Sequence, residues 1–153
     1  MNPDFKDLLS AFNARGVEYL VVGAHALAAH GHIRATKDLG VWVRACRGNA
    51  VKVLRALAEF GAPLHDLSTD DLSGPGLLFQ IGVEPLRIDV ITAIDGVDFD
   101  AAWPRRSIVK FGDVPVPVLA YQDLIENKKA AGRLQDLADV ERLEAMHRDK
   151  PSQ

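Results

Sequence analysis

The chain has 153 residues, of which 48% are hydrophobic and 25% are charged, and its formal net charge is −3. This length suits one domain with one core, and this composition excludes a disordered or fibrous chain. The acidic balance argues against a protein that coats nucleic acid non-specifically, because such binding needs many Lys and Arg side chains against the phosphates. We expect a single domain over residues 1–147 and a frayed tail over 148–153.

The cysteine content and the apolar segments indicate the compartment. Cys46 is the one cysteine, so an internal disulfide is excluded and a reducing compartment is expected. The N-terminus, MNPDFKDLL, has no basic segment followed by an apolar run, and no stretch of 18 apolar residues occurs. The sequence therefore predicts a cytoplasmic protein without a signal peptide and without a membrane partner.

Apolar periodicity and turn residues predict alternating helices and strands. In chain order, the predicted elements are a helix at 3–15, a strand at 17–23, a helix at 24–31, a strand at 38–44, a helix at 49–60, strands at 77–82 and 86–94, a helical turn at 99–103, strands at 107–111 and 114–119, and helices at 121–131 and 135–147. Residues 62–76, rich in Asp, Ser, Gly and Pro, are predicted to form a loop. The two prolines in 114–119 favour a sheet edge. This order is typical of a single α+β or mixed α/β domain.

Two aspartates and a glycine stand out in the predicted strands. Asp38 opens a strand, and side-chain alternation puts it on the same face as Gly40. A glycine inside a strand packs nothing, so either something approaches its backbone closely or an expected side chain is missing. Asp89 lies mid-strand between apolar residues, where aspartate is disfavoured, and Arg87 on its face could pair with it structurally.

These residues belong to a spaced motif: a turn at Gly23-Ala24, thirteen further residues, the segment Asp38-Leu39-Gly40-Val41, and Asp89 on a later strand. The motif resembles that of the nucleotidyltransferase superfamily, which includes DNA polymerase beta. More narrowly, three segments are similar to small bacterial nucleotidyltransferase-like proteins related to toxins of abortive-infection and toxin–antitoxin systems: VGAHALAAHGHIRATKDL, GVEPLRIDVITAIDGVDFDAAW and DLIENKKAAGRLQDLADVERLE. The resemblance covers about residues 17–144.

The resemblance implies an α+β nucleotidyltransferase-like fold, in which helices flank a central mixed sheet and a helix pair ends the chain. It implies transfer of NMP from an NTP to a hydroxyl through two Mg²⁺ ions roughly 4 Å apart. Asp38 and Asp89 would be the catalytic, metal-binding carboxylates, and Gly40 stands where a second carboxylate is usual, so the two-ion site would be weakened. The residues that the resemblance assigns to the nucleotide are Gly23, Ala24, Arg34, Thr36 and Lys128.

Each assignment has a structural alternative. Gly23 could mark an ordinary tight turn, Arg34 could brace a strand end, and Lys128 could lie on the solvated face of its helix. His25 and His30 are five residues apart, so they do not share a helix face as a metal-binding pair would.

Two functions of different classes remain open. The chain could be an enzyme that acts on an NTP and an RNA, protein or small-molecule acceptor. It could instead be a catalytically inactive binding or regulatory module, such as a toxin–antitoxin component, with an antitoxin or a second copy of the chain as its partner. Gly40 could also be an engineered replacement of an aspartate, and the sequence does not separate natural loss from engineering.

Overall fold

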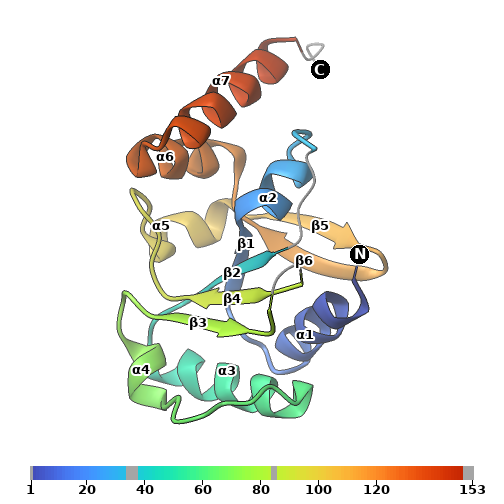
Figure 1. Cartoon of the computed structure of the whole chain (residues 1–153), viewed down its shortest axis with the longest axis vertical. Helices are drawn as coiled ribbons and strands as arrows, with labels where there is room; N and C mark the ends of the chain where they lie inside the picture. The colour runs from blue at the N-terminus through green and yellow to red at the C-terminus, as the bar shows by residue number, and fades with distance from the viewer. Residues whose placement is uncertain (1, 34–37, 84–85, 150–153) are drawn as a thin grey trace.

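The computed structural model describes residues 2–33, 38–83 and 86–149. In this part of the chain, six strands form one mixed sheet in the order β3-β4-β2-β1-β6-β5 (Figure 1). The strands are β1 (Tyr19–Val22), β2 (Leu39–Val43), β3 (Leu78–Ile81), β4 (Ile88–Ile91), β5 (Ser107–Phe111) and β6 (Val114–Val118). The helices are α1 (Pro3–Ala14), α2 (Gly23–Ala29), α3 (Arg47–Phe60), α4 (Thr69–Ser73), α5 (Phe99–Ala102), the 3₁₀ helix η1 (Trp103–Arg105), α6 (Tyr121–Ala131) and α7 (Leu134–Arg148). The predicted α+β architecture is confirmed.

Helices cover both faces of the sheet, with α1, α3 and α4 on one side and α2, α5 and the α6–α7 pair on the other (Figure 1). α1 forms where its capping residues predict it. Asn2 Oδ1 accepts a hydrogen bond from the Asp4 N–H at 2.7 Å, and Pro3 takes the first helical position. The side of α1 that faces the core carries four buried residues: Phe5, Leu8, Leu9 and Phe12.

β2 lies inside the sheet and is buried on both faces. Leu39, Val41 and Val43 share one face and Trp42 lies on the other, yet all four are at most 2% exposed. β2 runs antiparallel to β1 and parallel to β4, and helices cover both of its faces, so its sequence reads as an apolar run. Asp38 immediately precedes β2.

The strand β1 is shorter than the predicted strand at 17–23, because α2 already begins at Gly23. The φ angle of Gly23 is +70°, in the left-handed region that glycine adopts without strain. The chain therefore turns from strand to helix at this residue, without a loop.

The predicted loop at 62–76 contains a short helix, α4. A capping box stabilises its first turn: Ser68 Oγ accepts from the Asp71 N–H at 3.1 Å, and Asp71 Oδ2 accepts from the Ser68 N–H at 2.9 Å. The helix buries one side chain, Leu72. A helix of five residues has no repeated apolar spacing, so periodicity could not predict it.

The prediction that the prolines of β6 mark a sheet edge is wrong, because β6 lies between β1 and β5 and the edge strand is β5. Leu119 donates its N–H to Val21 O at 3.0 Å, so Pro115 and Pro117, at alternate positions before it, lie on the β1 side. Prolines have no N–H to donate, and the register of β1 with β6 is limited to Val21 opposite Val118. We call this short parallel contact the β1–β6 seam.

The C-terminal helix pair is confirmed as α6 and α7. Gly132, with φ of +69°, separates them. The loop after β4 packs closely on α6, because a Cβ placed on Gly96 would lie 2.5 Å from Ala130 Cβ. α7 continues to Arg148, and residues 150–153 of the expected tail lie outside the described residues. None of the helices in the described segments is long and apolar enough to cross a membrane.

Candidate functional site

The register of the sheet brings the predicted site residues to one end of three neighbouring strands. Val22 of β1 is opposite Gly40 of β2, and Gly40 is opposite Asp89 of β4. Cross-strand neighbours point to the same face, and Asp38 precedes Gly40 by two residues on that face. Gly23 follows Val22 directly. The turn, the glycine and both aspartates therefore meet, although they come from distant parts of the sequence.

One guanidinium joins the two aspartates. Arg87 Nη2 lies 3.1 Å from Asp38 Oδ2, and Arg87 Nε lies 2.9 Å from Asp89 Oδ1. The backbone N–H of Arg87 also donates to Asp38 Oδ1 at 3.3 Å. The three side chains are 23–26% exposed, so water reaches the cluster and screens it in part. The Arg87–Asp89 ion pair, which the sequence offered as the structural alternative to metal binding, is present, and Arg87 also contacts Asp38, a contact that the sequence did not indicate.

Gly40 leaves this cluster without a third carboxylate. A Cβ placed on Gly40 would lie 3.2 Å from Val22 Cγ2, so a side chain fits there once Val22 shifts by a few tenths of an ångström. Among the described residues, no group of three or more His, Cys, Asp or Glu side chains could hold a metal ion. Mg²⁺ prefers oxygen ligands and keeps several waters. In the described segments, Asp38 and Asp89 are therefore the carboxylates here that could contact a hydrated Mg²⁺ ion, and Arg87 contacts both of them.

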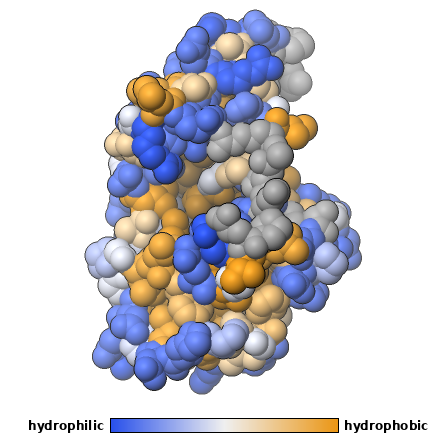
Figure 2. Space-filling view, in the orientation of Figure 1, coloured by the Kyte–Doolittle hydropathy of each residue, from blue (hydrophilic) through white to orange (hydrophobic). Residues whose placement is uncertain are grey.

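A cavity of about 270 Å³ extends from this end of the sheet to the helix pair. Val22, Gly23 and Ile91 line it on the sheet side, and Ile91 shares the face of Asp89. The other lining residues are Ala93, Ile94, Asp95, Asn127, Lys128, Ala131, Arg133 and Asp136. Figure 2 shows apolar surface between the helix pair and the sheet. The cavity thus joins Gly23 and Lys128, two residues that the sequence assigned to the nucleotide.

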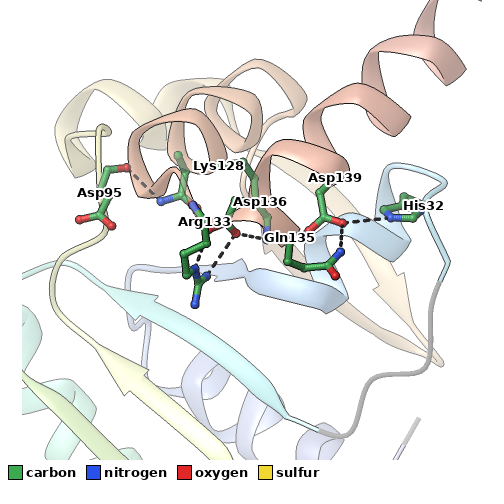
Figure 3. Close-up of polar contacts among 8 residues, drawn as sticks. His32, Asp95, Lys128, Arg133, Gln135, Asp136 and Asp139 are labelled. Atoms are coloured by element: carbon green, nitrogen blue, oxygen red, sulfur yellow. Dashed lines mark hydrogen bonds and ion pairs between the residues drawn. The ribbon is translucent and has the colours of Figure 1, made fainter.

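Lys128 lies in a network of charges between α6 and α7 (Figure 3). Its Nζ is 3.3 Å from Asp136 Oδ1 and 3.3 Å from Asp139 Oδ2, and the lysine is only 7% exposed. Arg133 Nε donates to Asp136 Oδ2 at 2.6 Å, and this hydrogen bond lowers the pKa of the Asp136 carboxyl below its ordinary value. Lys128 is therefore a paired, buried cation on the cavity wall and not part of a solvated helix face.

The same network ties α7 to the segment that precedes β2. Asp139 Oδ1 lies 3.3 Å from His32 Nε2 and accepts from Gln135 Nε2 at 2.9 Å (Figure 3). Sequence analysis did not single out His32, because 107 positions separate it from Asp139 and no spacing rule links them. On the other flank, Asn127 Nδ2 donates to Asp95 O at 2.9 Å and holds the loop after β4 against α6.

The remaining predicted residues lie at varied places. Ala24 is in the first turn of α2, and Arg34 and Thr36 lie outside the described residues. His30 Nε2 is 2.7 Å from Leu119 O, which gives it a structural role. The ring of His25 packs against Phe5, and burial lowers the pKa of its imidazole.

Solved structures share this fold. ANT(2")-Ia in complex with adenylyl-2"-tobramycin is 15% identical with a TM-score of 0.61, over 94% of this chain and 86% of that one. The lincosamide antibiotic adenylyltransferase LnuA, bound to lincomycin, is 14% identical with a TM-score of 0.59, over 95% of this chain and 98% of that one. A candidate nucleotidyltransferase from Thermotoga maritima, TM1012, is 15% identical with a TM-score of 0.57, over 95% and 91% of the two chains.

At these identities the likeness establishes the fold, which is that of nucleotidyltransferases. The sequence matches no family model and no curated protein.

Proposed function

We propose that this chain, which shares the fold of nucleotidyltransferases, transfers NMP from an NTP to a hydroxyl acceptor at a rate weakened by Gly40. The observation that supports this proposal is that Asp38 and Asp89 meet next to Val22 and Gly23, which line the same cavity as Lys128. Two carboxylates beside the cavity and a lysine on its wall are residue types that suit a magnesium-bound triphosphate. Asp38 and Asp89 would hold the ion, and the backbone of Gly23 and Ala24 would contact phosphate oxygens.

The reaction forms a bond between the acceptor oxygen and the α-phosphorus and breaks the bond to pyrophosphate, with loss of the hydroxyl proton. When bound, Mg²⁺ supplies charge neutralisation and lowers the pKa of the attacking hydroxyl. The chain would orient the reactants: Asp38 and Asp89 would hold the ion, and Lys128, which is paired with Asp136 and Asp139, would contact phosphate only by sharing its ammonium group with these aspartates. Arg34 and Thr36 remain predicted nucleotide contacts.

Among the acceptor classes, a small molecule with a hydroxyl group is favoured over RNA or protein. The support comes from LnuA and ANT(2")-Ia, whose structures hold lincomycin and adenylyl-2"-tobramycin. Their matches cover 95% and 94% of this chain. Cytoplasmic location, and an antitoxin or a second copy as partner, remain predictions from the sequence.

A binding or regulatory module is the second candidate. It is favoured by the donor set, because Gly40 supplies no ligand and Arg87 already contacts both remaining carboxylates. Such a module would bind a nucleotide or a partner without transferring NMP. It would fit a toxin–antitoxin component.

Gly40→Asp tests the enzyme proposal. The change should raise transfer of labelled nucleotide from NTP to an acceptor in a cell extract, by on the order of 10² to 10³, the loss typical of one missing electrostatic group. Gly40→Asn is the matched control, since its side chain has nearly the same size and no charge, and it should not restore transfer. Adding Asp89→Ala to Gly40→Asp should abolish the gain.

The outcome separates the two candidates. Mg²⁺ should also raise the melting temperature of Gly40→Asp, because the ion relieves repulsion between the new carboxylate and Asp38. If Gly40→Asp transfers no nucleotide from any of the four NTPs and gains no stability from Mg²⁺, the enzyme proposal is rejected in favour of the binding module.

A further inference from the structure

Arg87 contacts, through its guanidinium, the same carboxylate oxygens that a metal ion at this site would bind. Its guanidinium contacts carboxylate oxygens from two strands: Nη2 lies 3.1 Å from Asp38 Oδ2 and 3.4 Å from Asp89 Oδ2, and Nε lies 2.9 Å from Asp89 Oδ1. Oxygens that share one nitrogen in this way need only small rotations to reach one Mg²⁺, whose oxygen ligands lie about 2.1 Å from it. The guanidinium and a divalent ion therefore compete for the same oxygens.

The donor count limits how many cations can be held. Two carboxylates carry two negative charges, of which Arg87 already balances one. A second divalent ion would need a donor that faces both ions, and the position in register with Asp89, Gly40, has no side chain. With Arg87 in place, one divalent ion already brings three positive charges to two carboxylates, and among the described residues a second ion would find no bridging ligand.

We propose that Arg87 is a built-in cation of this site, which holds Asp38 and Asp89 together and limits the site to a single divalent ion. This inference rests on the proposed function, which places Mg²⁺ at these two carboxylates. Arg87 acts here as a positioning residue, because it sets where the two carboxylates lie and how strongly they attract the ion. A purely structural ion pair would affect folding but not the affinity or the number of metal ions.

The test uses Mn²⁺, a paramagnetic ion that replaces Mg²⁺ in oxygen sites, titrated into the full chain without nucleotide and followed by electron paramagnetic resonance. The wild-type chain should bind one Mn²⁺. Arg87→Gln should bind Mn²⁺ at least about tenfold more tightly, because removal of a positive charge from between the two carboxylates strengthens their attraction for the ion. Arg87→Lys, which keeps the charge, should stay within about threefold of wild type.

The matched control is Arg105→Gln, which removes a guanidinium from another Arg–Asp pair. Arg105 Nη2 lies 2.7 Å from Asp123 Oδ1 and Arg105 Nε lies 3.0 Å from Asp123 Oδ2. This variant should leave the affinity for Mn²⁺ unchanged. Circular dichroism verifies that each variant is folded, and if Arg87→Gln is not, the stoichiometry of the wild-type chain decides.

The possible results separate this inference from the proposed function. Two Mn²⁺ ions on the wild-type chain, or equal or weaker affinity in Arg87→Gln, would overturn the role of Arg87 while the metal site stands. If neither wild type nor Arg87→Gln binds Mn²⁺, the metal site itself fails and the inference fails with it. Tighter binding by Arg87→Gln, together with one ion on wild type, supports the inference whether or not transfer is detected.

Discussion

Gly96 is the residue that allows the loop after β4 to lie directly against α6. A side chain there is unfavourable twice, because φ is +76° and a Cβ would lie 2.5 Å from Ala130 Cβ and 3.2 Å from Glu126 O. We expect Gly96→Ala to lower the free energy of unfolding by about 1–3 kcal/mol, as overpacking and strain usually do, measured by urea denaturation.

Gly74→Ala is the matched control for Gly96→Ala. The φ angle of Gly74 is −115° and a Cβ there would meet nothing within 4 Å, so we expect a change within about 0.5 kcal/mol. Ala130→Gly added to Gly96→Ala should recover part of the loss, since it removes the nearer of the two contacts. Equal stability of Gly96→Ala and wild type would show that the loop moves away from α6 freely.

At the residue scale, the sequence indicated the candidate site through single unusual positions. Asp89 was singled out because aspartate is disfavoured in the middle of a strand, and Arg87 was the structural alternative to a metal ion as its partner because residues two apart share a strand face. The contact of Arg87 with Asp38 depends on the parallel register of β2 and β4. A register between distant strands follows from the whole core, so local spacing could not predict it.

At the scale of elements, the docking of α7 depends on buried charges. Asp139 is 1% exposed and contacts Lys128, His32 and Gln135, so it links α7 to α6 and to the segment before β2. We expect Asp139→Asn to lower the free energy of unfolding by on the order of 2–4 kcal/mol, since removal of one partner leaves Lys128 partly uncompensated in the interior.

Glu141→Gln is the control for Asp139→Asn, because it removes an acid from an exposed position of the same helix. Its effect on urea denaturation should be within about 0.5 kcal/mol. If Asp139→Asn is equally mild, the helix pair is held by its apolar contacts, among them Val140 and Leu143, and not by the charge network.

Long elements with a repeated pattern could be predicted from the sequence, and short or tertiary features could not. The apolar spacing of α1 and the glycine between α6 and α7 were sufficient to predict these helices. The prolines of β6 leave one side of the strand without backbone donors, but that side faces β1 across the seam and not solvent. Which strand lies beside another depends on the whole sheet, so the prolines alone predicted the wrong position for β6.

At the scale of the whole molecule, the β1–β6 seam is the shortest pairing in the sheet and separates β3, β4, β2 and β1 from β6 and β5. Asp38, Gly40 and Asp89 lie on β2 and β4 or next to them, on one side of the seam, whereas Lys128 lies on α6, which follows β6 in the chain. The seam has one register pair, while β1 shares four pairs with β2 and β5 shares five with β6. The carboxylates therefore lie on strands on one side of the seam and Lys128 lies on the helix that follows the other side, although the contacts of Asn127 and Gly96 also join α6 to the loop after β4.

The seam is therefore a candidate hinge. Hinge motion there would change the distance between the carboxylates Asp38 and Asp89 and Lys128, while the strands on both sides of the seam stay folded. The Leu119 amide reports on such opening, because its hydrogen bond to Val21 O crosses the seam. In native-state hydrogen exchange we expect the free energy of the opening that exposes the Leu119 amide to be lower than the opening free energy for the amide of Val41 in β2. Equal opening free energies for the two amides would contradict the hinge. If the hinge exists, a bound nucleotide that contacts both the carboxylates and Lys128 should slow exchange at Leu119 more than at Val41, since it would hold the two sides of the seam together.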